Sequence, residues 1–341
     1  MRAALIATIT FTALIPAAAK QPDFEALLTK ANLYIEAVKY TERAVDSWDR
    51  YRNWVNLKTG PTGKEEYIDY GLYSVPDLDG QLSETRAIIP KAPPLDKLDA
   101  AMTRYLDAYA PLIPVLNRAA DYYDNKEYAA DKITEGKKLH KEIVALMPPF
   151  LEARAAIMPD LRALAREVEG REVAELEERE GKSPSYHAAA IQHAASDVID
   201  FFPRVRPEPM THEMFEQAFK ELGPDTPGEK FDELIMGKME VPEVSIDVKG
   251  MGDALQRYRA AVSSFDSFVA TNTQSTKDFD RLKPLPKQLL DLVSELHEGL
   301  VKSDGKDFEG GGRLTQQIVE LYFELMNAVS PIAQSRVRFL P

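Results

Sequence analysis

The segment from Asp121 to His140 carries a dense group of residues that could bind a ligand or a metal ion. Its sequence, DYYDNKEYAADKITEGKKLH, combines carboxylates, tyrosines and a histidine. Carboxylate oxygens bind hard divalent cations, and a neutral imidazole is a common metal ligand. The pattern therefore indicates a candidate metal site, and with it a metal-dependent enzyme or metal-binding protein, made of Asp121, Asp124, Asp131 and His140.

The same segment can instead be the joint between two helices. The spacing of a calcium-binding loop fails, because Lys126 stands where such a loop needs glycine and Lys132 where it needs a bidentate glutamate. Asp124 and Asn125 favour a turn, since their side chains can hydrogen-bond neighbouring backbone amides. We expect a helix–turn–helix joint first, and we keep its acidic residues as the place to test for a ligand.

Tyrosine and tryptophan are concentrated in the first part of the chain. Eleven of the 14 tyrosines and both tryptophans lie between Tyr34 and Tyr128. These side chains pair an apolar ring with a polar tip, so a cluster on facing helices can line a binding groove. At helical spacing the same rings more often fill a bundle core. The candidate ligand-binding residues are Trp48, Tyr122, Tyr123 and Tyr128.

The sequence contains no catalytic motif that we recognise. The chain has no cysteine, which excludes a disulfide framework and a thiol nucleophile. No two of the five histidines stand at positions i and i+4, and the glycine run at 310–312 lacks the lysine of a phosphate-binding loop. We therefore predict no cofactor, and an enzyme is the less expected class.

The dominant period of the apolar residues is helical. The period predicts one long helix over 23–56, a Gly- and Pro-rich connection to about residue 80, and a helix over 95–123 that Pro111 and Pro114 kink near Ala110. A third helix is expected from Tyr128, bent or interrupted by its prolines and ended at Gly181.

Further helices are expected near 185–202, 253–270, 286–302 and 314–336, around an irregular Pro- and Gly-rich segment at about 203–252 that holds one plausible extended piece. No segment alternates as a sheet requires. The predicted fold is all-α: a bundle of long, partly kinked amphipathic helices with a Pro/Gly-rich insertion. We expect residues 20–341 to form a single helical domain.

Composition and the first residues indicate an exported protein. The 55 acidic and 42 basic residues give a net charge of −13, which argues against nucleic acid as a partner.

Residues 1–19 have the order of a secretory signal peptide: Arg2, an apolar run, and Ala17-Ala18-Ala19 before Lys20. We expect cleavage after Ala19, a periplasmic or secreted location, and no stable transmembrane segment afterwards.

Two stretches resemble the YiiG-like family of bacterial envelope proteins, a domain family of unknown function. The resemblance rests on Lys30, Asn32, Tyr34 and Ile35, and on a later set: Leu98, Asp99, Tyr105, Leu112, Tyr122, Tyr123, Tyr128, Asp131, Lys132, Gly136, Leu139 and His140. It implies a helical fold and an envelope location. Many members resemble lipoproteins, but this chain lacks the cysteine that lipid attachment needs. The resemblance supplies no catalytic residue.

Together these patterns favour an exported helical protein that acts as a binding or structural module of the bacterial envelope. Its partner is expected to be another envelope protein or a small ligand. The metal-dependent alternative uses the acidic residues of the 121–140 joint.

Overall fold

The computed structural model describes residues 23–65, 67–202, 245–272, 277–306, 308 and 312–337, together with Gln217 and Lys220. Every regular element within these residues is a helix, so the predicted all-α class is confirmed. None of the helices described in this way is long and apolar enough to cross a bilayer. The expected signal peptide and most of the 203–252 segment lie outside the described residues.

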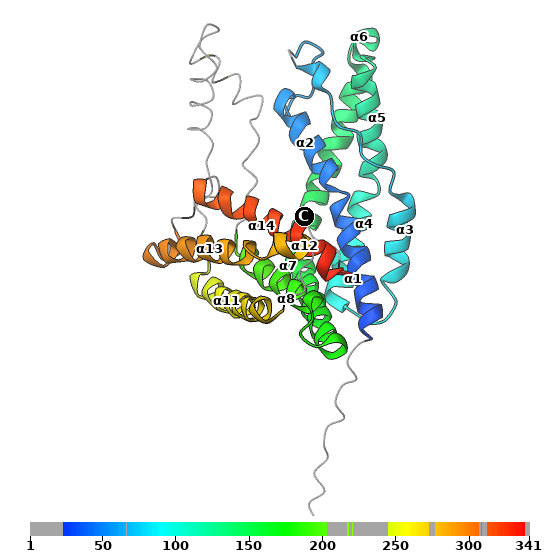
Figure 1. Cartoon of the computed structure of the whole chain (residues 1–341). Coiled ribbons are helices and arrows are strands. Elements are labelled where there is room, and N and C mark those ends of the chain that lie inside the picture. Colours follow the sequence, from blue (N-terminus) through cyan, green and yellow to red (C-terminus); the bar gives the residue numbers. More distant parts are fainter. Residues whose placement is uncertain are drawn as a thin grey trace, which may run out of the picture.

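The first group of helices forms an elongated bundle (Figure 1). Helices α1 and α2 follow one another along one row, α4 and α5 follow one another along a second, and the first half of α7 packs against α1, α4 and α5. The short α3 packs against α1. Their bounds are α1 Phe24–Lys39, α2 Glu42–Trp54, η1 Ile68–Tyr70, α3 Asp79–Ile88, α4 Asp96–Tyr109, α5 Leu112–Asp124, α6 Tyr128–Asp131 and α7 Thr134–Glu180.

The single long helix predicted over 23–56 is wrong, because the chain breaks it at Tyr40 and Thr41. The Thr41 hydroxyl donates to the backbone oxygen of Val38 at 2.7 Å and accepts a hydrogen bond from the Tyr105 hydroxyl of α4. A threonine that bonds its own backbone competes with helix continuation, and Tyr105 fixes it in that state. The break leaves Tyr40 exposed at the junction of α1 and α2.

The proline-dependent predictions have mixed outcomes. The chain does break near Ala110, where α4 ends and α5 starts after Pro111. In contrast, α7 runs without interruption through Pro148, Pro149 and Pro159 and ends at Gly181 as predicted. Its buried face packs along the whole bundle, and this tertiary packing outweighs the local cost of the prolines. Helix α3 was not predicted, because it begins inside the Gly- and Pro-rich connection.

The second group packs around the other half of α7. It contains α8 Pro184–Ile199, α11 Val248–Thr271, α12 Lys277–Leu282, α13 Leu285–Lys302 and α14 Arg313–Ala333. The bounds of α8, α11, α13 and α14 lie close to the predicted ones, except that α11 starts earlier and α14 ends before Arg336; α12 was not predicted. Figure 1 shows α11, α13 and α14 lying across the axis of the first bundle.

The buried side chains form two clusters that share α7. The first cluster gathers residues of α1 to α5 and α7 as far as Val168, together with Val337 near the C-terminus. The second begins at Leu176 and gathers residues of α8 and α11 to α14. The single helical domain over 20–341 stays a prediction.

Candidate functional site

The predicted ligand-binding aromatics belong to the first core. Trp48, Tyr122 and Tyr123 are buried, and Tyr128 is half-buried. The Tyr123 ring lies 5.0 Å from that of Tyr122 and 6.2 Å from that of Tyr128, whereas Trp48 contacts the cluster through Tyr51. The structure therefore brings these rings together as a framework. A binding role for them stays a prediction.

The predicted metal ligands do not converge in the same way. Asp121 and Asp124 are exposed. Asp131 accepts hydrogen bonds from the Glu135 amide and the Tyr122 hydroxyl, each at 2.8 Å, and these bonds hold the pKa of its carboxyl below the usual range. His140 is buried with its Nδ1 3.0 Å from the Tyr51 hydroxyl, and burial lowers its pKa.

No group of three or more histidines and carboxylates able to hold a metal ion occurs in the part of the chain that the structure describes. The 121–140 segment is instead the helix–turn–helix joint that its sequence favours. Helix α5 ends at Asp124 and is capped at Asn125, and Lys126 adopts a left-handed φ of 55°. The metal site stays a prediction that geometry among the described residues does not support.

The aromatic core fixes the backbone of residues 70–75, which connect η1 to α3. The Trp54 indole donates to the Gly71 oxygen at 2.9 Å, and the Ser47 hydroxyl donates to the Tyr73 oxygen at 3.0 Å. From α5, the Asn117 side-chain oxygen accepts the Val75 amide at 2.8 Å. Three side chains from α2 and α5 therefore determine where this irregular segment runs.

Gly71 is required for this arrangement. Its φ of 53° lies in the left-handed region, and a Cβ built there would stand 2.9 Å from the Cβ of Tyr123. The glycine therefore allows the segment to approach the aromatic core closely enough for Trp54 to reach its backbone oxygen.

The fixed segment places tyrosines beside basic side chains of α2. The guanidinium carbons of Arg43 and Arg50 lie 3.8 and 4.4 Å from the centre of the Tyr73 ring. Arg50 also lies 5.6 Å from the Tyr70 ring, and its Nε donates to the Tyr70 oxygen at 2.6 Å. We call the following set the arginine–tyrosine surface: Lys39, Tyr40, Arg43, Arg50, Tyr70 and Tyr73.

An open pocket of about 560 Å³ lies at this surface. Its lining residues are Lys39, Tyr40, Glu42, Arg43, Ser74, Val75 and Pro76. The Tyr40 side chain is 44% exposed and that of Tyr70 is 50% exposed. Glu42 is bound by Arg154 of α7, so its charge is already compensated.

The basic side chains of the surface lack such compensation. Among the residues that the structure describes, Lys39, Arg43 and Arg50 form no ion pair with a carboxylate. A pocket that combines the exposed Tyr40 ring with the cations of Lys39 and Arg43, which form no ion pair within the described residues, can bind an anionic ligand.

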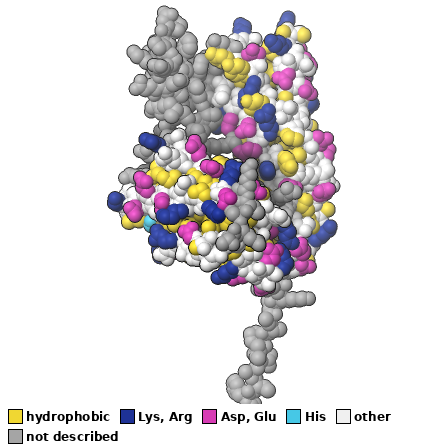
Figure 2. Space-filling model, viewed as in Figure 1, with side chains coloured by type: hydrophobic (Ala, Val, Ile, Leu, Met, Phe, Trp, Pro, Cys, Tyr) yellow, Lys and Arg dark blue, Asp and Glu magenta, His cyan; other side chains and the backbone are white. Residues whose placement is uncertain are grey.

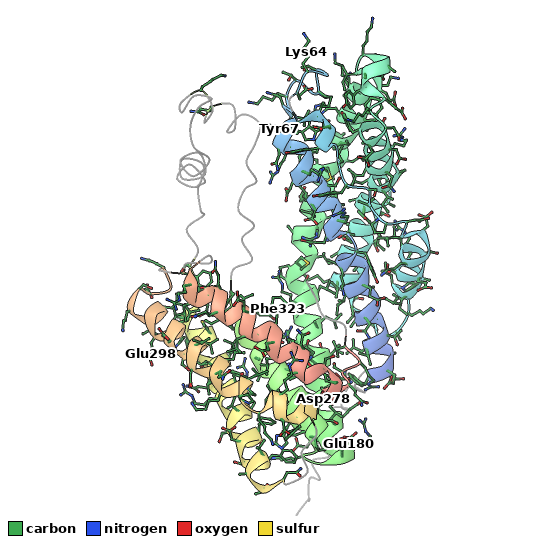
Figure 3. All side chains as sticks on the ribbon, turned by 45° about the horizontal axis from the view of Figure 1, so that its top comes forward. Lys64, Tyr67, Glu180, Asp278, Glu298 and Phe323 are labelled. Carbon is green, nitrogen blue, oxygen red and sulfur yellow. The ribbon has the colours of Figure 1, made fainter. Side chains whose placement is uncertain are left out.

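The other half of the molecule offers a different kind of surface. In Figure 2 an apolar area lies over the α13–α14 side, and Phe323 of α14, labelled in Figure 3, is 62% exposed. A pocket of about 460 Å³ between the ends of α13 and α14 carries both signs of charge, from Glu295, Glu298, Lys302 and Arg313. It therefore shows no preference for an anion or a cation.

Sequence reasoning missed Arg43, Arg50 and Tyr73. One signal was available: Arg43 and Arg50 stand seven positions apart, which places them on one face of a helix. The position of Tyr73 could not be inferred, because it depends on hydrogen bonds between an irregular segment and two distant helices. In Figure 3, Tyr67 and Lys64 lie together at one end of the first bundle, and the Tyr67 ring lies 5.1 Å from that of Tyr70.

Comparison of the sequence with known proteins shows which protein family the chain belongs to. The family model described as "Protein of unknown function (DUF3829)" matches residues 25–291. The uncharacterized protein YiiG of Escherichia coli (strain K12) is 30% identical over 179 residues, which cover 50% of this chain and 49% of the relative. The match thus spans about half of that relative. No solved structure matches the chain. The extent of the family match shows that the chain belongs to the DUF3829 family of proteins of unknown function.

Proposed function

We propose that the protein is an exported binding protein of the bacterial envelope, and that its ligand binds at the arginine–tyrosine surface. The observation that carries this proposal is the pocket at the α1–α2 junction, where the exposed Tyr40 ring lies with the basic side chains of Lys39 and Arg43. Residues 1–19 support export, because they have the charge and apolar pattern of a signal peptide.

The surface is held in place before any ligand arrives. Hydrogen bonds from Trp54, Ser47 and Asn117 fix the segment that carries Tyr70 and Tyr73. A ligand that binds a preorganised surface does not have to order that segment, and this lowers the entropic cost of binding. A binding module needs such a surface, whereas a purely structural helix bundle does not.

Export is tested by fractionating cells that express the full chain. We expect the mature protein in the periplasmic or secreted fraction, with Lys20 as its first residue on N-terminal sequencing. A matched chain in which Met replaces residues 1–19 should stay in the cytoplasm. Cytoplasmic retention of the full chain would remove the envelope from the proposal.

Binding is tested by sedimenting the purified mature protein with isolated envelope fragments. We expect the wild-type protein in the pellet at low salt. The double variant Arg43→Gln and Arg50→Gln should lose at least about tenfold in apparent affinity. The matched control carries Arg86→Gln and Arg118→Gln, which change net charge equally but remove exposed ion pairs elsewhere. Equal sedimentation of both double variants would contradict the proposal.

A further inference from the structure

We propose that the ligand of the arginine–tyrosine surface is an acidic oligosaccharide, whose sugar rings carry carboxylate or phosphate groups. This inference rests on the proposed function and names the class of ligand.

The charges favour an anion. The whole chain carries a net charge of −13, yet Lys39, Arg43 and Arg50 are the basic groups of this surface. Arg43 and Arg50 approach one and the same ring, at 3.8 and 4.4 Å from its centre, so their charges cannot be farther apart than the sum of these distances. Two like charges at such a separation repel one another, and an anion bound beside both relieves the repulsion.

Arg43 and Arg50 also have side-chain N–H groups that are available to donate hydrogen bonds to a ligand. Within the described residues no side-chain N–H group of Arg43 donates a hydrogen bond, and the Arg50 guanidinium donates only through its Nε. A guanidinium group binds carboxylate or phosphate through two parallel N–H donors, which fixes the orientation of the anion. The pair can thus bind neighbouring anionic groups of one ligand.

The tyrosine rings favour a ligand that has an apolar ring face as well as a negative charge. Tyr40, which lines the pocket, and Tyr70, which lies outside its lining, are about half exposed, and Val75 and Pro76 give the pocket an apolar wall. A sugar residue has an apolar ring face that can stack on an aromatic side chain, and an acidic sugar carries its charge on the same rigid unit. An acidic peptide brings carboxylates on flexible chains, and an inorganic anion brings charge without a ring.

The pocket is of suitable size, and nearby carboxylates limit its strength. Its volume of about 560 Å³ falls in the range of pockets that bind small molecules, about 300–1,000 Å³. Asp46 lies one helical turn from both Arg43 and Arg50, and Asp69 precedes Tyr70. These carboxylates weaken the positive field, so we expect binding that is moderate and that decreases as salt increases.

Titration calorimetry with defined probes tests the inference. The probes are a hexamer of galacturonic acid, a neutral hexamer of glucose, pyrophosphate and a hexaglutamate peptide. We expect the galacturonic acid hexamer to bind the mature protein at least about tenfold more tightly than each other probe. The Arg43→Gln and Arg50→Gln double variant should lose at least about tenfold in affinity for it, and Tyr40→Ala about threefold to tenfold.

The remaining outcomes would contradict the ligand class, the binding site or the proposed function. Equal binding of pyrophosphate or hexaglutamate would show that the rings do not contribute, and would overturn the sugar class. Binding that survives in the double arginine variant would overturn the site. If envelope fragments bind but the acidic hexamer does not, the ligand class is wrong while the proposed function stands. If neither the envelope fragments nor the acidic hexamer bind, the results contradict both the ligand class and the proposed function. Circular dichroism of each variant confirms that it remains folded.

Discussion

The two cores of the molecule differ in how they use aromatic and polar side chains. In the first core the fully buried large residues include Trp54, Tyr34, Tyr51, Tyr105 and Tyr123, together with Lys30. The second is built mainly from alanine, leucine, valine and phenylalanine, and its one fully buried tyrosine, Tyr258, donates to the Pro286 oxygen within the same layer. The first core thus contains many polar tips that need partners.

Some of those tips have their partners on helices, as Tyr34 with Asp99 and Tyr51 with His140, but those of Lys30, Trp54 and Ser47 reach irregular segments of the chain. The Lys30 ammonium reaches the backbone oxygens of Ile89, Lys91 and Pro93 at 2.9, 3.1 and 3.0 Å, and the Asp99 carboxylate at 2.8 Å. Trp54 and Ser47 do the same for residues 70–75. The first core therefore positions loops and the surface they carry, whereas the second core mainly buries apolar area.

The largest expected effect comes from Lys30→Met. Removing the buried ammonium leaves the Asp99 carboxylate without its paired cation and three carbonyl groups without this donor, so we expect a loss of about 3–5 kcal/mol in the free energy of unfolding. Denaturant titration measures it. Lys39→Met is the matched control on an exposed lysine and should stay within about 0.5 kcal/mol of wild type. A loss below about 1 kcal/mol for Lys30→Met would contradict the positioning role of this core.

The next largest effect comes from Trp54→Phe, and a matched substitution in the second core shows whether the two cores differ. Trp54→Phe removes the hydrogen bond to Gly71 and part of a buried ring, and should cost about 2–3 kcal/mol. It should also speed amide exchange at residues 71–75. Phe265→Leu in the second core should destabilise the chain by a loss of packing and leave exchange at 71–75 unchanged. Similar exchange changes in both variants would show that the cores do not differ in this way.

Acid should destabilise the second core through His187. Burial, and then the charge of Lys182, lowers the pKa of His187 to about 4, and its ring lies 4.5 Å from that of Phe268. The unfolded chain, with a histidine pKa near about 6.5, binds this proton more readily. The contribution is therefore fully present above about pH 6.5 and is lost as pH falls towards about 4, on the order of 2 kcal/mol.

Denaturant titrations between about pH 7 and 4 check this effect. His187→Gln should flatten the decline of the free energy of unfolding. Burial also lowers the pKa of His140, so His140→Gln should change the decline with the same sign in the first core. An unchanged pH dependence in His187→Gln would contradict the assignment.

The smallest effect concerns the contact between the two halves. Arg336 binds Glu25 of α1 and Glu172 and Glu175 of α7, and its backbone oxygen accepts a hydrogen bond from Asn32 at 2.8 Å. These groups are partly exposed, so Arg336→Ala should cost about 1 kcal/mol at low salt and less at high salt. The control Arg86→Ala removes one exposed ion pair with Asp107 and should cost about half of that or less. Equal losses would show that the Arg336 contacts add nothing.

Much of the fold follows from the sequence because apolar periodicity and helix-ending residues are local signals. The break before Pro111 and the end of α7 at Gly181 are examples. The continuity of α7 through three prolines could not be inferred, since it depends on packing against several helices. The break at Thr41 depends on Tyr105, which lies 64 positions away.

The candidate site was harder to predict from the sequence, because it too depends on contacts between residues that are distant along the chain. The sequence showed the concentration of tyrosines, and it correctly favoured core filling for Tyr122 and Tyr123. It could not show that Tyr73 lies over Arg43 and Arg50, because hydrogen bonds from Trp54, Ser47 and Asn117 create that contact.

Hydrogen–deuterium exchange of the mature protein, with and without envelope fragments, shows whether binding occurs at the arginine–tyrosine surface. We predict added protection in residues 39–50 and 70–76, and no change in α13 and α14. The Arg43→Gln and Arg50→Gln double variant should show no added protection at either place. Protection confined to α13 and α14, or unchanged protection in the double variant, would contradict the assignment of binding to the arginine–tyrosine surface.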